Sequence, residues 1–160
     1  MDDFDHDFYV LLHSCNCVKV FPQNNGSEFT VRLPQTVDLK GDWEVAVTDF
    51  QYENDFRVEY SSSYEALAIP RPTMILIYCN AVCNQFVGGE KKQLLGVVPI
   101  AEYGCRRGSV TFNQLNYVRV AESSLRDIKI SLTDQQGKPL VYSGYKDFTL
   151  VRLHFCKRTW

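Results

Sequence analysis

The three histidines of this sequence are the first residues to consider for metal binding or acid–base catalysis. His6, His13 and His154 are scattered along the chain, and none lies two to four residues from another histidine or from a plausible third ligand. A metal site built on β-strands needs two histidines on one strand face and a carboxylate nearby, so that several ligands converge on one ion. The spacing therefore predicts no metal site of this kind.

The cysteines give no stronger signal for chemistry. Cys15 and Cys17, and Cys79 and Cys83, have loose metal-ligand spacing but lack the paired short-knuckle pattern of zinc sites. No serine lies in a glycine-flanked nucleophile elbow, and no cysteine has a histidine partner in sequence. We therefore expect no catalytic residue, no cofactor-binding residue, no metal ligand and no cofactor, and we predict that the chain is not an enzyme.

Charged residues also argue against phosphate and nucleic-acid binding. Gly88-Gly89 lacks the pattern of a phosphate loop and predicts a β-turn. The formal net charge of −2 provides no overall positive field for nucleic acid, so no specific nucleic-acid contact is expected. We interpret the basic residues of two loops as solvated charges, with binding of an acidic partner as the alternative; they are Lys91, Lys92, Arg106 and Arg107.

The six cysteines are expected to be free thiols. Met1 is followed by acidic residues where a signal peptide would have a basic segment and an apolar run, so a reducing compartment is favoured. Asn25-Gly26-Ser27 matches the glycosylation triplet but is typical of a turn here. No apolar stretch approaches the roughly 20 residues of a membrane-spanning helix.

The elements that would position any site are short strands, because the dominant hydrophobic period is two. Glu28–Leu33 alternates strictly, with Phe29, Val31 and Leu33 on one face, and Pro34 is expected to end this strand. Trp43–Phe50 predicts a second strand. Its residues Trp43, Val45 and Val47 share a face and are expected in the core.

Later segments continue the strand pattern. Thr73–Tyr78 is apolar on both faces, which indicates a strand that is covered from both sides or lies at a subunit contact. Leu94–Ile100 predicts an edge strand because of Pro99. Ile128–Thr133 enters a glycine-containing hairpin turn that ends at Lys138, with 140–142 as the returning strand, and 148–155 is expected to contain a bulge near Val151. Helix should be limited to short turns such as 121–127 or 112–115.

About eight to ten short strands predict a sandwich or barrel-like double sheet. Nothing in the chain suggests a second domain, so residues 1–160 are expected to form one domain, with 1–7 as a flexible acidic N-terminus. The chain opens with four acidic residues and closes with basic ones, which either pair with each other or remain solvated; these are Asp2, Asp3, Asp5, Asp7, Arg152, Lys157 and Arg158.

A set of segments that spans nearly the whole chain forms a recognisable pattern. In order, they are Phe8–Ser14, Phe21–Asn24, Phe29–Pro34, Leu39–Val47, Ile77–Asn80, Gln85–Gly88, Leu94–Ile100, Ile128–Thr133, Gly137 and Leu150–Phe155, and the most specific piece is Gly41-Asp42-Trp43-Glu44-Val45. These segments resemble a known family, the minor capsid or penton proteins of Maverick/Polinton elements and adintoviruses. One departure is that the segment between Tyr52 and Thr73 is shorter than in many relatives.

The resemblance implies an all-β fold, a single jelly-roll sandwich of two antiparallel sheets with about eight strands plus short extra hairpins. It implies a structural protein of the virion: a homopentamer that caps capsid fivefold vertices beside a double jelly-roll major capsid protein and assembles inside the host cell, in the nucleus. Interface candidates are Thr73–Tyr78 and exposed tyrosines among Tyr9, Tyr52, Tyr60, Tyr64, Tyr103, Tyr117, Tyr142 and Tyr145. The alternative is a host-domesticated jelly roll that binds proteins or glycans.

Overall fold

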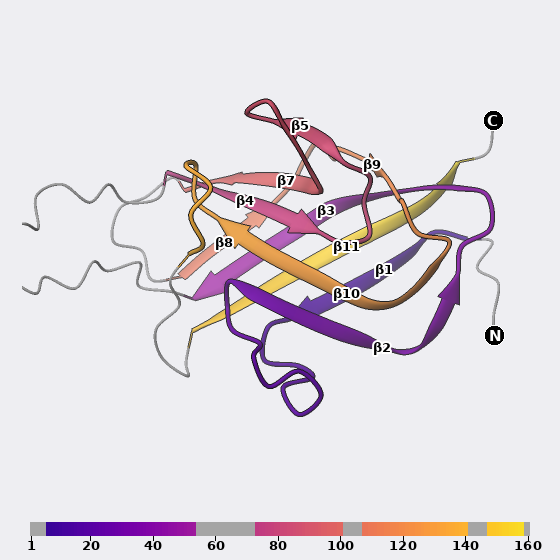
Figure 1. Cartoon of the computed structure of the whole chain (residues 1–160), viewed down its shortest axis with the longest axis horizontal. Coiled ribbons are helices and arrows are strands. Elements are labelled where there is room, and N and C mark those ends of the chain that lie inside the picture. The colour runs from indigo at the N-terminus through magenta and orange to yellow at the C-terminus, as the bar shows by residue number, and fades with distance from the viewer. Residues whose placement is uncertain (1–5, 54–72, 101–106, 141–146, 159–160) are drawn as a thin grey trace, which may run out of the picture.

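The described part of the chain forms two facing antiparallel sheets. The computed structural model describes residues 6–53, 73–100, 107–140 and 147–158. One sheet has the order β1-β11-β3-β8, with β9 beside β3, and the other has the order β2-β10-β4-β7 (Figure 1). The bounds are β1 (Phe8–His13), β2 (Glu28–Asp38), β3 (Asp42–Glu53), β4 (Met74–Cys79), β5 (Gln85–Val87), β6 (Glu90–Lys92), β7 (Leu94–Pro99), β8 (Arg107–Thr111), β9 (Val118–Arg119), β10 (Ser124–Thr133) and β11 (Phe148–Arg158).

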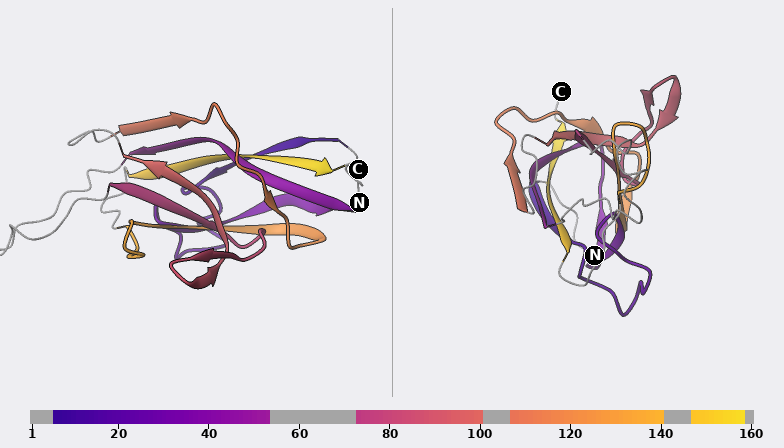
Figure 2. Two further views of the ribbon diagram at one scale, coloured as in Figure 1. Left: turned by 90° about the horizontal axis from the view of Figure 1, so that it is seen from above. Right: turned by 90° about the vertical axis from the view of Figure 1, so that its left-hand side faces the viewer.

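The pairing identifies the fold as a jelly roll. The first long strand pairs with the last, β1 with β11, and the pairing then moves inward through β2 with β10, β3 with β8 and β4 with β7. This is one long antiparallel ribbon rolled into two sheets, which face each other in Figure 2. The β5–β6 hairpin and β9 are additions to the eight strands. The predicted fold class is confirmed, and none of the described residues forms a helix that could span a membrane.

The core lies between the sheets. Trp43, Val45 and Val47 are buried, as predicted, and Trp43 Nε1 donates a hydrogen bond of 3.1 Å to the Lys40 carbonyl. This bond satisfies the polar end of the indole, so its rings are buried without an unpaired donor. Phe8 stacks on Phe155 with centroids 4.9 Å apart and closes the end of the core that β1 covers.

Strand β2 confirms the predicted alternation but not its predicted end. Phe29, Val31 and Leu33 are buried, yet the strand continues through Pro34 to Asp38. Proline is tolerated because β2 is an edge strand that pairs only with β10, and Pro34 lies where the register between Arg32 and Val37 shifts.

The bulge expected near Val151 lies on the partner strand instead. Strand β11 keeps its alternation, with Thr149, Val151 and Leu153 all inward, while β3 carries the extra residue between Val47 and Asp49. Sequence reasoning missed this because Thr149 is polar. Its hydroxyl donates to the Gly26 carbonyl at 2.7 Å, which makes its complete burial possible.

The remaining sequence-based expectations are partly wrong, partly confirmed and partly outside the described residues. Residues 124–127 belong to β10 and not to a helical turn. Gly137 has φ 85° in the hairpin turn, as predicted. Several expectations fall outside the described residues: residues 1–5 of the acidic start, residues 54–72 of the segment between Tyr52 and Thr73, most of the returning strand after Leu140, Cys105, Arg106, and Tyr60, Tyr64, Tyr103, Tyr142 and Tyr145.

Candidate assembly surfaces

The histidines do not converge. In the described part of the chain, no three histidine, cysteine, aspartate or glutamate side chains are arranged to hold a metal ion. His13 Nδ1 accepts a hydrogen bond of 3.0 Å from the Cys15 amide, and its ring stacks on Phe148 with centroids 5.1 Å apart. Partial burial lowers the pKa of His13. These contacts give His13 a structural role between β1 and β11.

His154 connects an acid and a hydroxyl on the outer face of β11. Its Nδ1 lies 2.6 Å from the Tyr117 hydroxyl, and its Nε2 lies 3.4 Å from Asp7 Oδ2. Burial raises the pKa of Tyr117 above its usual value. The chain of contacts therefore ties β1 and the segment before β9 to β11.

The surface charges of the described strands are largely neutralised in pairs. Arg152 and Arg158 pair with Asp49 and Glu44 of β3, so these basic residues near the end of the chain meet acids of the neighbouring strand. Lys91 and Lys92 belong to β6 and not to a loop, and Lys92 Nζ lies 3.6 Å from Glu90 Oε2. Such exposed pairs contribute little to stability, but they remove the single-sign patches that would attract a polyanion.

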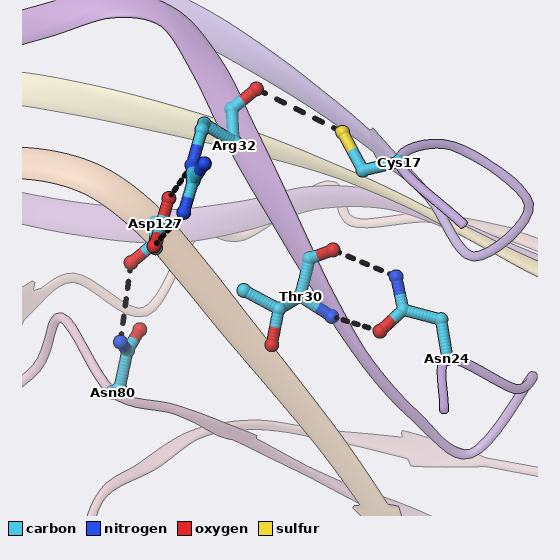
Figure 3. Close-up of polar contacts among 6 residues, drawn as sticks. All are labelled: Cys17, Asn24, Thr30, Arg32, Asn80 and Asp127. Carbon is cyan, nitrogen blue, oxygen red and sulfur yellow. Dashed lines mark hydrogen bonds and ion pairs between the residues drawn. The ribbon is translucent and has the colours of Figure 1, made fainter. Parts of the chain in front are cut away.

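The free edge of β2 is partly blocked by a side chain (Figure 3). Asn24 Nδ2 donates to the Thr30 carbonyl at 2.8 Å, and Asn24 Oδ1 accepts from the Thr30 amide at 2.9 Å. The carboxamide thus occupies both backbone groups that a further strand would pair with. Farther along β2, Arg32 forms two hydrogen bonds to Asp127 of β10, and the Cys17 thiol lies 3.9 Å from the Arg32 carbonyl.

Of the two alternatives for Thr73–Tyr78, a strand covered from both sides is confirmed. Three consecutive residues, Ile75, Leu76 and Ile77, are buried, and β4 lies between β10 and β7. Tyr52 is also buried. Tyr9 was predicted as an interface candidate if exposed, and it is 55% exposed. Tyr117 is half-buried.

An open groove follows the side of the sandwich where β1 and β2 are edge strands. Its volume is about 540 Å³. We call it the β1–β2 groove, and its lining residues are Tyr9, Val10, Leu11, Asn16, Cys17, Val31, Arg32, Leu33 and Pro34. Most of these side chains are apolar, and Leu11 is 58% exposed at its rim. The groove can accommodate an apolar side chain.

The β5–β6 hairpin projects from the other end of the β2-β10-β4-β7 sheet (Figures 1 and 2). Gly88 and Gly89 have φ of 57° and 86°, which confirms the predicted turn and suits a two-residue hairpin. Phe86 is 76% exposed, and Lys91 Nζ lies 5.8 Å from the centre of its ring. Sequence reasoning did not identify Phe86 as a surface aromatic; its position beside the two glycines was the available signal.

The cysteines of the described residues form no disulfide. Cys15 is exposed, Cys17 is half-buried with φ of 60°, and Cys83 and Cys156 are half-buried. Cys79 is fully buried, and desolvation raises its pKa to about 11. Its thiol is therefore a small apolar core group without nucleophilic character.

Comparisons with known proteins identify a structural relative. No protein-family model and no curated protein matches this sequence. Among solved structures, the mavirus penton protein superimposes with a TM-score of 0.62 over 96% of this chain and 100% of that chain, at 8% sequence identity. The two proteins therefore share a fold across their whole length.

Proposed function

We propose that this protein is a structural virion protein, a penton subunit that assembles into pentamers at the fivefold vertices of an icosahedral capsid and catalyses no reaction. The observation that carries the proposal is the full-length match between this jelly roll and the mavirus penton protein. The resemblance of its sequence segments to pentons of Maverick/Polinton elements and adintoviruses points to the same role.

The surface chemistry supports assembly more than catalysis. A ring of identical chains needs two different surfaces on each copy, which meet head to tail. The β1–β2 groove and the β5–β6 hairpin provide two such surfaces, one concave and one projecting. Some of the exposed apolar side chains lie on these surfaces and others at Val18, Val20, Met74 and Val97, so contacts with a second type of subunit have candidates as well.

The remaining parts of the proposal concern the capsid around the ring. We propose a double jelly-roll major capsid protein as the second partner, the virion as the location, and the host nucleus as the place of assembly. These rest on the resemblance of the sequence to the penton family.

The experiment is the solution mass of the purified chain, measured by light scattering over a range of concentrations with a reducing agent present. A mass near five times the 18.4 kDa chain is expected. A monomer at every concentration would contradict self-assembly by this chain.

A second candidate function is a host-retained jelly roll that binds a protein or glycan, and the open β1–β2 groove is the observation that favours it. Glycan-array or pull-down binding by a strictly monomeric chain, lost when Leu11 is replaced by Lys, would support this alternative.

A further inference from the structure

We propose that the β5–β6 hairpin of one copy docks into the β1–β2 groove of the next copy, with Phe86 as the anchor. The proposal rests on the proposed function, since it names the two surfaces through which the ring would close. It also gives a role to the most exposed large apolar side chain in the described part of the chain.

The hairpin has the properties of a preorganised anchor. Its two strands pair in register from Gln85 with Lys92 to Val87 with Glu90, and its turn uses two glycines in left-handed conformations. Its base is held by Gln93, whose side-chain amide donates to the Asn80 and Val82 carbonyls, each at 3.0 Å. A rigid element that presents an aromatic ring loses little conformational entropy when it binds.

The groove is suited to receive a side chain and not a strand. Asn24 already occupies both backbone groups of Thr30, so a neighbouring strand cannot pair with β2 at that position. Val10, Val31 and Leu33 are among the residues that line the groove, and Leu11 adds an exposed apolar side chain. Burying a phenyl ring against such residues is favourable, and aromatic anchors in pockets dominate the binding energy of many interfaces.

The two surfaces lie at opposite ends of one sheet. Strand β2 is at one end of the order β2-β10-β4-β7, and the hairpin connects β4 to β7 at the other (Figure 1). A contact between different surfaces is heterologous, and repeating it produces a closed ring or a filament and not a twofold dimer. This is the type of contact that a pentamer requires.

The occupant is a second copy because this chain itself presents both an apolar groove and a projecting aromatic side chain. The charge of the groove is balanced within the chain, since Arg32 of the lining holds both carboxylate oxygens of Asp127. Lys91 lies next to Phe86 and has no ion-pair partner among the described residues, so it stays at the solvated rim when the ring docks.

A cross-linking experiment tests this contact directly, because Cys17 is a native thiol in the groove. The chain carries C15S, to remove the neighbouring exposed thiol, together with K91C, which keeps the Phe86 anchor because Lys91 is its cross-strand partner on the hairpin. Mild oxidation of the assembled protein should join residue 91 of one copy to Cys17 of the next, as identified by mass spectrometry of the linked peptides. The matched controls are V97C in place of K91C, and C17S added to K91C; neither should give this link.

A second variant distinguishes failure of the docking contact from failure of subunit association as a whole. Because Phe86 is mostly exposed, F86S should unfold at the same urea concentration as the wild type while its subunit association weakens by at least about tenfold. If the wild type forms rings but F86S forms them equally well and the cross-link is absent, the docking proposal is wrong while the proposed function stands. If the wild type does not associate at all, both fail.

Discussion

The ring of Tyr52 on β3 lies directly over Gly108 on β8, its cross-strand partner. A Cβ at position 108 would overlap Tyr52 Cε1. The absence of a side chain at Gly108 therefore lets the tyrosine stay buried, beside Phe50 at a centroid distance of 5.9 Å. This contact positions β8 at the edge of its sheet.

Replacing Gly108 with Ala should destabilise the protein by about 1–3 kcal/mol, because the methyl group overpacks against Tyr52. The control is G96A, whose Cβ would lie 3.4 Å from Val47 Cγ2, an ordinary contact. Urea unfolding measures both. In a Y52V background the cost of G108A should fall, and an equal cost in both backgrounds would show that the ring is not the cause.

Replacing Asn24 with Ala should expose the backbone of Thr30 to solvent, because both of its hydrogen bonds to the carboxamide are lost. Hydrogen–deuterium exchange should show at least about tenfold faster exchange of the Thr30 amide. The neighbouring Q23A, at an exposed position, is the control and should leave this rate unchanged. Unchanged exchange in N24A would mean that Thr30 is protected by something else.

The stability that Arg32 contributes should depend on pH. A hydrogen bond from Arg32 lowers the pKa of Asp127 below its usual value of 3.8. A lowered pKa in the folded state adds stability above the unfolded pKa, and this stability is lost as the pH falls through the folded pKa. The advantage of the wild type over R32Q should therefore be complete at neutral pH and shrink below about pH 4.

The expected pH-dependent part is small, because both side chains are well exposed to solvent. Loss of the Arg32–Phe21 stacking adds a difference that does not vary with pH. Urea unfolding at several pH values between about 2 and 7 measures this, with K19Q as a control for the loss of one positive charge. A wild-type advantage that stays constant over this range would contradict the role of the ion pair.

Cys79 should resist alkylation in the folded protein. With a pKa of about 11, roughly one Cys79 thiol in a thousand is ionised at pH 8, and the side chain is buried. Iodoacetamide should label Cys15 rapidly and Cys79 only after denaturant is added, as peptide mass spectrometry would show. Comparable labelling of both residues without denaturant would mean that the core opens at β4.

Much of the fold was predictable because alternation is a strong local signal. Glu28–Leu33 and Trp43–Phe50 face a common core; the first buries every second residue, and the second does so with Trp43, Val45 and Val47 before the bulge in β3 moves the next core position to Phe50. The errors arose where tertiary contacts changed the meaning of a residue. Pro34 continues a strand because that strand is at an edge, and Thr149 is buried because the hydroxyl reaches Gly26 from β11.

The candidate assembly surfaces could not be predicted in the same way. The β1–β2 groove joins residues of β1 and β2 from opposite sheets, and no local pattern reports that they share an edge of the sandwich. Thr73–Tyr78 has the composition of an interface, but its central position covers it. Phe86 is exposed only because its strands form a separate hairpin outside both sheets.

The most direct test of the proposed assembly is the rotational symmetry of the purified complex in single-particle electron microscopy. We predict closed rings of five copies, with the β5–β6 hairpin of each sandwich against the β1–β2 groove of its neighbour. Twofold dimers would contradict the proposed penton role. Single subunits in the images, at concentrations where light scattering detects association, would also contradict it.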